Sequence, residues 1–566
     1  MLLASILGML IVTFIVFFIL VSSVSFGEPV VIKNNSILTV SLHKPLKDYA
    51  GVPSIDPISF TIESNLGLNS VIWGIGRAKN DSRIKGIYLD LTVINGGIAS
   101  IQEIRNALID FKQSGKYIIA YAESYTQKAY YLATVADKIY LNPFGSVDFK
   151  GMSSTVTFYK GLFDKLGIDM QIIRHGKFKS AIEPFTLTKM SDENREQIKT
   201  YMGSIWNHIL QAISASRNIS VEDLNNIADN LGLSFANDAL DKNFVDKLMS
   251  ENEVIEELKK YTGEQTLNTV SISQYYIPLP VDKKGDKIAV IYASGEIISG
   301  DGDTEVMSAN MVRAIKTARS DSTVKAVVLR VNSPGGSALA SDVIARELEI
   351  TKRNKPVVIS MGDVAASGGY WISAPGQKIF AQHTTLTGSI GVFGIIPNIQ
   401  KTLEDKIGIT TDVVKTNENA DFPAITRPLR PAERNYLQKS VENVYSVFIS
   451  NVGKSRNMTT EMVDSIGQGR VWSGSNAYDL GLIDYFGGMK DAIEEAAKMA
   501  NITNYTLLEL PKELSTIEML MKSFEAKISG SVNNELVNTL KHYEFVTNTI
   551  KNYGVVAKMP YNMEIE

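Results

Sequence analysis

The sequence contains no cysteine and only five histidines among its 566 residues. Without cysteine the chain can form no disulfide bond, use no thiol nucleophile and build no zinc site on sulfur ligands. No two histidines are four residues apart, the spacing that presents a metal-binding pair on one helix face. The histidines are His43, His175, His208, His383 and His542. We therefore expect no bound metal.

A large surplus of charge is also missing. The formal net charge is −4, and charged residues make up 21% of the chain against 44% hydrophobic residues. This composition is typical of a globular protein. It provides neither the basic field that nucleic acid binding requires nor an acidic tail, so we expect no nucleic acid partner.

One long stretch carries no charge at all. Residues 2–24 are rich in Leu, Ile, Val and Phe, and about 20 apolar residues suffice to span a bilayer as a helix. A cleaved signal peptide is the alternative, but its apolar core is usually shorter, follows a basic segment and precedes a small-residue cleavage site. We therefore predict a retained transmembrane anchor. No Lys or Arg precedes it to fix its orientation.

The sequence repeats itself with a period of about 240 residues. Residues 81–91 and 321–331 are similar position by position. In both copies a glycine pair, a stretch with helical periodicity and a β-branched strand follow: Gly96-Gly97, 98–113 and 117–121 in the first, and Gly335-Gly336, 338–353 and 357–361 in the second. Two copies of one domain are therefore expected.

Each copy alternates short apolar strands with amphipathic helices, which predicts an α/β fold with mostly parallel strands. A chain of this length is also too long for one ordinary core. We predict one transmembrane helix followed by two tandem domains, a linker between them and an extension. In chain order the boundaries are 2–24 for the anchor, 36–262 for the first domain, 263–283 for the linker, 284–500 for the second domain and 501–566 for the extension.

A candidate nucleophile lies in the second copy, in the segment V-V-I-S-M-G-D-V-A-A-S-G-G-Y-W at 357–371. The pattern predicts a strand that ends near Met361, a turn of small residues, and a helix that begins near Ser367. Small neighbours let a substrate backbone approach the hydroxyl. The amide of Gly368, at the start of the helix, could donate to a developing oxyanion. Alternatively, Ser367 merely caps the helix.

A second amide donor is available from the Pro-Gly-Gly turn in V-N-S-P-G-G-S at 331–337. The N–H of Gly336, together with that of Gly368, would make an oxyanion hole. Taken alone, Pro-Gly-Gly is an ordinary turn.

Three motifs in this order, V-N-S-P-G-G-S, G-D-V-A-A-S-G-G-Y-W-I-S and L-T-G-S-I-G, give a specific resemblance. The chain resembles the long form of the signal peptide peptidase A family, also called protease IV, over nearly its whole length after the anchor. The resemblance implies two Clp-protease/crotonase-like domains and a serine peptidase that uses a Ser/Lys dyad. It implies no metal and no cofactor.

A serine nucleophile needs a base to take its proton. The segment K-S-A-I-E-P-F that begins at Lys179 resembles the motif in which the family places its lysine base. Its small and apolar neighbours favour burial, which lowers the pKa of a lysine. Lys177 is the competing lysine and fits the motif less well. His383, the only histidine of the second copy, lies too close after Ser367 for the Clp-type pattern. Ser389 matches the family's serine that orients the base.

The two copies complement each other. In the repeat alignment Gln127 stands opposite Ser367, so the first copy has no nucleophile at that position. The position opposite Lys179 falls near Ala420, so the second copy has no base there. One composite site between the two domains is therefore expected.

The resemblance further implies degradation of cleaved signal peptides and other apolar peptides near a membrane. It implies a single-pass protein of the bacterial inner membrane with its catalytic domains on the periplasmic side, bound to the bilayer through its N-terminal helix and assembled as a homotetramer. Two alternatives stay open. One is acyl-CoA chemistry on the related crotonase fold, which needs no Ser/Lys dyad. The other is a non-catalytic membrane scaffold, which would be expected to lose Ser367 or Lys179; both are present.

Overall fold

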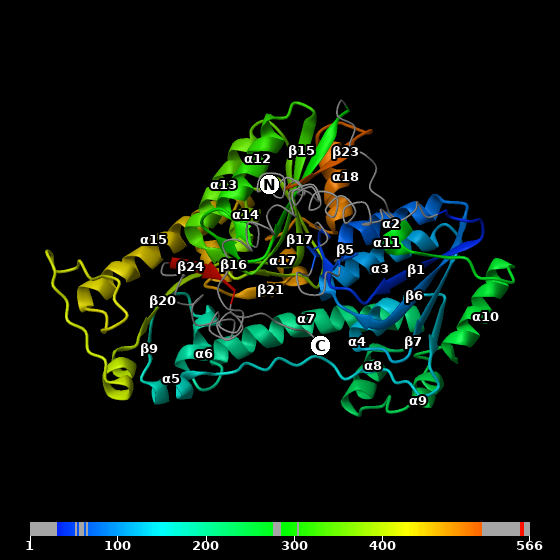
Figure 1. Cartoon of the computed structure of the whole chain (residues 1–566), viewed down its shortest axis with the longest axis horizontal. Helices are drawn as coiled ribbons and strands as arrows, with labels where there is room; N and C mark the ends of the chain where they lie inside the picture. The colour runs from blue at the N-terminus through cyan, green and yellow to red at the C-terminus, as the bar shows by residue number, and fades with distance from the viewer. Residues whose placement is uncertain are drawn as a thin grey trace, which may run out of the picture.

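The computed structural model describes residues 31–50, 54–55, 62–63, 66–275, 285–302, 305–511 and 555–559. The predicted anchor, residues 2–24, lies outside these ranges. No helix within them is both long and apolar enough to cross a membrane. We call residues 31–275 the first half and residues 285–511 the second half. The two halves lie side by side, the first drawn in blue to green and the second in green to orange (Figure 1).

The first half is built on a sheet of six strands that are all parallel to their neighbours. Its central strands are buried almost throughout, as expected where helices cover both faces. In sheet order the strands are β10 (Lys247–Leu248), β8 (Lys138–Leu141), β7 (Tyr117–Ala122), β6 (Ile84–Ile94), β1 (Ser36–Leu42) and β11 (Thr269–Ser271). The last strand falls within the range predicted as linker.

The second half repeats this order in its own sheet. The equivalent strands are β22 (Tyr485–Phe486), β18 (Lys378–Ala381), β17 (Val357–Ala366), β15 (Val324–Ser333), β12 (Lys287–Ser294) and β23 (Thr506–Leu510). Two further strands, β19 (Leu386–Gly388) and β21 (Val471–Ser473), extend the sheet beside β17. The sequence predicted that β17 ends near Met361, which is wrong: it continues to Ala366 because residues 364–366 pair with β19.

Equivalent hydrogen bonds confirm that the halves are copies. The hydroxyl of Tyr130 donates to the carbonyl of Phe244 at 2.8 Å, and that of Tyr370 donates to Leu482 at the same distance. The predicted helices are α3 (Ile98–Lys112) in the first half and α13 (Ala338–Lys352) in the second. The repeat read from the sequence is therefore a repeat in space.

A third sheet joins the halves. Its strands, in order, are β14 (Val306–Met307), β13 (Ile297–Ile298), β16 (Gly335–Ser337), β24 (Val555–Lys558), β20 (Val392–Asn398) and β9 (Asp169–His175). Strand β9 belongs to the first half but pairs antiparallel with β20 over seven residues of the second. The chain just after β9 is thereby carried onto the second half (Figure 1).

Two helices of 26 residues dominate the helical layer, α7 (Asp192–Arg217) and α15 (Pro431–Arg456). Each ends at an asparagine in the left-handed conformation, Asn218 and Asn457, which closes the helix where glycine is otherwise common. Helix α7 runs along one side of both halves (Figure 1) and contacts β21 of the second. It therefore bridges the two copies.

The remaining helices are shorter. They are α2 (Leu68–Asn80), α4 (Gln127–Ala133), α5 (Lys160–Leu166), η1 (Ser180–Ile182), α6 (Glu183–Thr186), α8 (Val221–Asp229), α9 (Ala236–Asp241), α10 (Glu251–Thr262), α11 (Ile272–Tyr275), α12 (Ser308–Ser320), α14 (Gly368–Ser373), η2 (Thr402–Ile407), α16 (Thr460–Ile466), α17 (Gly474–Asp479) and α18 (Met489–Met499). Four two-residue strands pair in two small sheets: β2 (Leu46–Lys47) with β5 (Leu66–Gly67), and β3 (Ser54–Ile55) with β4 (Ile62–Glu63).

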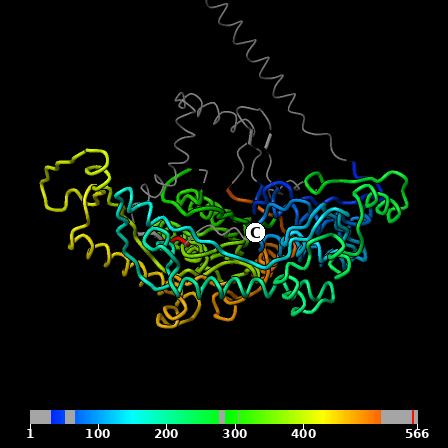
Figure 2. The backbone as a smooth tube through the Cα atoms, turned by 90° about the horizontal axis from the view of Figure 1, so that it is seen from below, coloured from blue at the N-terminus to red at the C-terminus, as the bar shows by residue number. Residues whose placement is uncertain are grey.

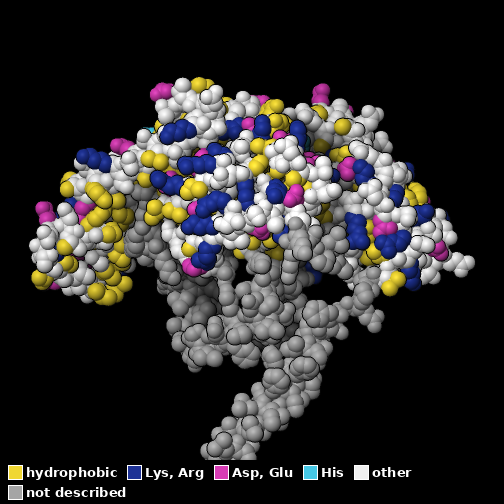
Figure 3. Space-filling model, turned by 90° about the horizontal axis from the view of Figure 1, so that it is seen from above, with side chains coloured by type: hydrophobic (Ala, Val, Ile, Leu, Met, Phe, Trp, Pro, Cys, Tyr) yellow, Lys and Arg dark blue, Asp and Glu magenta, His cyan; other side chains and the backbone are white. Residues whose placement is uncertain are grey.

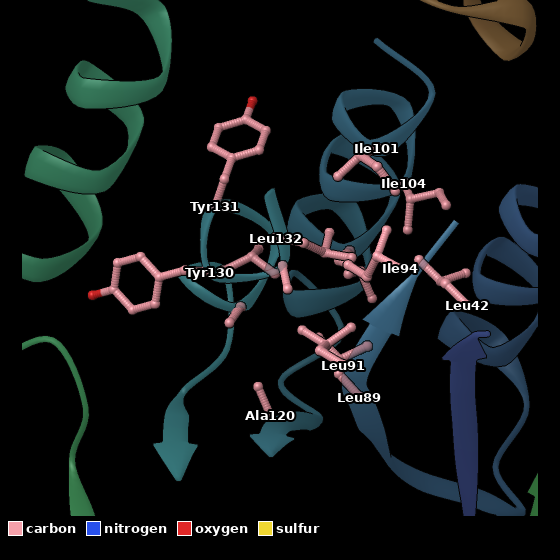
Figure 4. Packing of buried hydrophobic residues seen from close by; sticks show 14 of the residues in the cluster. Leu42, Leu89, Leu91, Ile94, Ile101, Ile104, Ala120, Tyr130, Tyr131 and Leu132 are labelled. Carbon is pink, nitrogen blue, oxygen red and sulfur yellow. The ribbon is translucent and has the colours of Figure 1, made fainter. Parts of the chain in front are cut away.

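Each half has its own apolar core. In the first half, side chains of β1 and β6 meet those of α3, among them Leu42, Leu89 and Ile101, and Leu132 of α4 joins them (Figure 4). The second half has an equivalent cluster around β12, β15 and β17. The described chain forms an elongated, shallow arc, and the segment after β20, drawn in yellow, projects at one end (Figure 2).

Candidate active site

Ser367 stands at a sharp strand-to-helix junction. It follows β17 directly and is the residue before α14, with φ 56° and ψ −114°, a conformation that costs energy for a residue with a side chain. Its side chain is fully buried. The flanking glycines are needed for space: a Cβ on Gly368 would lie 2.7 Å from the hydroxyl oxygen of Ser341, and one on Gly369 would lie 2.5 Å from the carbonyl of Ser333.

Lys179 reaches this serine from the other half of the chain. It lies between β9 and η1, and its Nζ is 2.8 Å from Ser367 Oγ, although the two residues are 188 positions apart in the sequence. The same Nζ lies 3.0 Å from the hydroxyl and 3.2 Å from the carbonyl oxygen of Ser389. The structure thus brings together the three side chains that the sequence predicted.

The lysine side chain is enclosed by the second half. A Cβ on Gly469 would lie 2.6 Å from Lys179 Cβ, and one on Gly391 would lie 3.3 Å from Lys179 Cδ, so two glycines make room for its stem. The side chain has no exposed surface. No ion pair to it is present in the described part of the chain, and burial lowers the pKa of the amine well below its ordinary value.

Gln197 of α7 positions the lysine segment, a role that was not predicted from the sequence. Its side-chain amide donates to the carbonyl of Phe178 at 3.1 Å and to the hydroxyl of Ser180 at 2.8 Å, the residues on either side of Lys179. Its oxygen accepts from the N–H of Val471 in β21 at 3.1 Å. One buried glutamine therefore ties the lysine segment to the second half. A polar residue at a core-facing position of a helix was the only available sign.

The turn that carries Gly336 lies against Gly368, the other predicted oxyanion donor. Gly335 and Gly336 have φ of +99° and +155°, which only glycine adopts easily, and a Cβ on Gly335 would lie 2.6 Å from the N of Gly368. The carbonyl oxygen of Ala557 lies beside Gly335 and Gly368. It is 3.1 Å from the position that a Cβ on Gly368 would take, and it is so close to Gly335 that a Cβ on Gly335 would overlap it.

Ala557 belongs to β24, which pairs antiparallel with β16 on one side and with β20 on the other. Gly336 stands opposite Ala557 in this register. The N–H of Met559 donates to the carbonyl of Pro334, and an antiparallel ladder repeats such bonds every second residue. The space between β16 and β20, beside Ser367, therefore accepts an extended peptide.

The alternative bases lie elsewhere. Lys177 is exposed and its amine lies over the ring of Phe178. The ring of His383 stacks on His208 and Phe486, with centroids 4.4 and 3.7 Å away. Burial lowers the pKa of both histidines, to about 4 for His208. At Gln127, opposite Ser367 in the repeat, the side chain only bonds the backbone at residues 150–151.

The second half also contributes a fully buried cation, which the sequence analysis missed. Arg330 of β15 forms ion pairs with Asp48 at 2.6 Å and with Glu103 at 2.7 Å, both from the first half. Burial alone would lower the pKa of Arg330, but the two carboxylates raise it above its ordinary value. Burial raises the pKa of Glu103. An arginine within an otherwise apolar strand run was a usable sign of a buried ion pair.

Known proteins match this chain over most of its length. Protease 4 of Salmonella typhi is 40% identical over 494 residues, which cover 84% of this chain and 78% of that protein. Protease 4 of Haemophilus influenzae is 37% identical over 448 residues, covering 76% and 72%. The chloroplastic serine protease SPPA of Arabidopsis thaliana is 31% identical over 515 residues, covering 88% and 75%. Among solved structures, a ClpP1 mutant from Listeria monocytogenes matches with a TM-score of 0.25 and 14% identity, over 36% of this chain and 94% of that one.

The model of Peptidase family S49 matches twice, at residues 110–265 and at residues 349–503, once in each half. This agrees with the repeat seen in the sequence and in the sheets, and it leaves no support for the acyl-CoA and scaffold alternatives. The chain belongs to Peptidase family S49 and is a serine peptidase made of two family repeats.

Proposed function

We propose that Ser367 and Lys179 are the nucleophile and general base of this peptidase. One observation carries the proposal: the 2.8 Å contact between a serine hydroxyl and a buried lysine amine whose pKa is lowered. A neutral amine has two N–H groups and one lone pair. The two oxygens of Ser389 can accept the N–H groups. The lone pair is then directed to the Ser367 hydroxyl, as deprotonation of the serine requires.

The reaction follows from this arrangement. Lys179 takes the proton of Ser367, whose oxygen attacks the peptide carbonyl, and the amides of Gly336 and Gly368 stabilise the negative oxygen of the tetrahedral intermediate. The resulting ammonium gives its proton to the leaving amine as the C–N bond breaks. Water, deprotonated by Lys179, then hydrolyses the acyl-enzyme and restores both side chains. Neither a metal nor a cofactor is required for any step.

The substrate is an extended peptide that adds a strand between β16 and β20. Support comes from β24, which takes this position with the carbonyl of Ala557 beside Gly335 and Gly368. Recognition by strand addition bonds the backbone of the peptide and so suits many sequences. Cleaved signal peptides and other apolar peptides near a membrane are the substrates we propose. Each half would have the Clp-protease/crotonase fold.

A membrane location and self-association complete the proposal. Residues 2–24 would anchor the chain in the bacterial inner membrane, with the catalytic halves on the periplasmic side.

The segment at 402–422 projects from one end and exposes apolar side chains, where hydrophobic atoms gather on the surface (Figure 3). Val414 is 98% exposed and Ile407 59%. We propose that this end packs against a second copy in a homotetramer. Light scattering on Val414→Asp tests it: an unchanged mass would contradict this interface.

The dyad is tested by the single variants Ser367→Ala and Lys179→Ala, with Lys177→Ala as the matched control. We expect the first two to lose at least about 10³-fold in kcat/KM on an apolar peptide while keeping their fold, and the control to keep wild-type rates. A serine-reactive phosphonate should label the wild type at Ser367 and leave Ser367→Ala unlabelled. Wild-type turnover by Lys179→Ala would refute the dyad.

A further inference from the structure

We propose that Asp363 is a positioning residue for Ser367. It anchors the last residues of β17, a strand of the second half, to helix α3 of the first half and thereby holds the serine in place. The inference rests on the proposed role of Ser367. Asp363 is a residue of the second half, four positions before the serine. Its carboxylate accepts from the N–H groups of Ala99 and Ser100 at 2.9 and 3.0 Å. It also accepts from the Ser100 hydroxyl at 2.6 Å.

These donors lie in the first turn of α3, a helix of 15 residues that has no side-chain cap from its own N-cap residue, Gly97. A carboxylate at this place satisfies free N–H groups and faces the positive end of the helix. Gly97 has an ordinary φ of −71°, so its conformation does not require glycine. Glycine is required here by lack of space, because a Cβ on Gly97 would overlap the carboxylate of Asp363.

The Gly96-Gly97 turn is the first-half copy of the Gly335-Gly336 turn. In the second half the oxygen of a peptide carbonyl lies against this turn, beside Ser367. In the first half the oxygens of Asp363 lie at the equivalent turn. The first half therefore holds a carboxylate of the other half at the turn that is equivalent to the proposed oxyanion turn.

The anchored residue lies in the irregular part of β17. Val331 of β15 pairs with Met361 and Ser333 pairs with Ala365, so β17 has two extra residues in this interval. Asn332 stabilises the irregular part by accepting from the N–H of Val364 at 3.1 Å. A bulge of this kind changes the direction of the strand that follows. Here it sets the path into Ser367.

Loss of the anchor should therefore affect the chemical step more than substrate binding. Ser367 has a strained backbone, which persists only while its surroundings hold it. The strands proposed to bind the peptide are β16 and β20, and Asp363 lies on neither. A displacement of about 1 Å at a nucleophile can cost about 10²-fold in rate. We expect kcat to fall and KM to stay nearly constant.

The experiment compares Asp363→Ala, Asp363→Asn and Ser100→Ala with the full chain. We expect kcat to fall about 10- to 100-fold in Asp363→Ala with KM within about twofold of wild type. A small phosphonate can label Ser367 without binding as a strand between β16 and β20, the space that we call the peptide groove. This labelling should slow by the same factor. Asp363→Asn keeps one acceptor oxygen and should recover part of the rate. Ser100→Ala, which removes a single hydrogen bond, should show the smallest loss.

Asp321→Asn is the matched control. Asp321 is also a carboxylate of the second half that accepts from a backbone N–H and a hydroxyl, both of Thr323, but it lies at the other end of β15. It should lose stability without losing kcat. Wild-type kcat and labelling rates in Asp363→Ala would overturn the proposal, and so would wild-type rates in Asp363→Asn if Asp363→Ala does not fold. Failure of the dyad itself would instead appear as turnover in Ser367→Ala or Lys179→Ala.

Discussion

Lys179 should make the stability of this protein depend on pH with a sign opposite to that of a salt-bridged lysine. Burial lowers the pKa of its amine well below the ordinary 10.5. In the unfolded chain the same amine has its ordinary pKa. Between these two values the unfolded chain holds one proton more than the folded chain, so the free energy of unfolding rises with pH. The stability cost of burying Lys179 therefore shrinks as pH rises towards 10.5.

The magnitude is a slope of about 1.4 kcal/mol per pH unit for one proton. In Lys179→Met no proton is taken up at this position, so its stability lacks the slope. The variant also leaves the Ser389 hydroxyl without the amine, at a cost of about 1–3 kcal/mol that does not depend on pH. The stability difference between the lysine and methionine proteins should thus change by about 1.4 kcal/mol per pH unit, in favour of lysine as pH rises.

Urea unfolding between pH 6.5 and 9 measures this difference. Every protein in the comparison carries Ser367→Ala, so that unfolded chains are not digested. Lys177→Met is the control, because Lys177 is exposed and only two residues away; its curve should run parallel to that of the reference. If the stability difference between the lysine and methionine proteins did not change with pH across this range, Lys179 would be protonated in the folded protein. A charged lysine cannot be the base that the mechanism needs.

Three further changes have expected outcomes. Arg330→Met leaves Asp48 and Glu103 buried without their cation and should lower the free energy of unfolding by about 3–5 kcal/mol in urea titrations. Gly469→Ala places a Cβ 2.6 Å from that of Lys179 and should abolish peptidase activity, whereas Gly263→Ala, with a similar positive φ and open space around it, should keep it. Removal of residues 555–566 frees the position of β24 and should raise kcat/KM on short peptides. The increase would be about tenfold if β24 occupies the groove about 90% of the time, because only about a tenth of the molecules could then bind substrate. An unchanged kcat/KM would show that β24 does not compete with substrate.

Local patterns in the sequence predicted the parts of the fold that are themselves local. The helices α3 and α13 begin and end within one residue of the predicted ranges, because periodicity and the glycine pairs mark them. The strand β17 was predicted too short, since the bulge at residues 362–364 interrupts its apolar pattern while β19 continues the pairing. Burial on both faces then conceals where such a strand ends.

What the sequence could not predict are the contacts between its halves. The pairing of β9 with β20, which carries Lys179 to Ser367, joins segments more than 200 residues apart, and neither strand specifies its partner. The resemblance to a known family pointed to Lys179, but nothing in its neighbourhood pointed to Gln197. Asp363 was read only as part of the nucleophile motif, because its partners at Ala99 and Ser100 come from the other copy.

The division of the site between two copies has a physical reason. A lysine on the surface of one domain would extend its amine into water and stay charged. Here Gly391 and Gly469 of the second half enclose its stem and Ser389 meets its amine, so the contact between the halves buries the amine and lowers its pKa. Weakening that contact should raise the pKa of Lys179 before it unfolds the protein.

Gln197→Ala, which releases the segment on both sides of the lysine, should therefore shift the rising limb of the kcat/KM–pH profile to higher pH. Gln438→Ala, at a partly buried glutamine of α15 that donates to Glu442, should leave the profile in place. A limb that stays fixed in Gln197→Ala would mean that the pKa of the lysine is lowered by its own half alone.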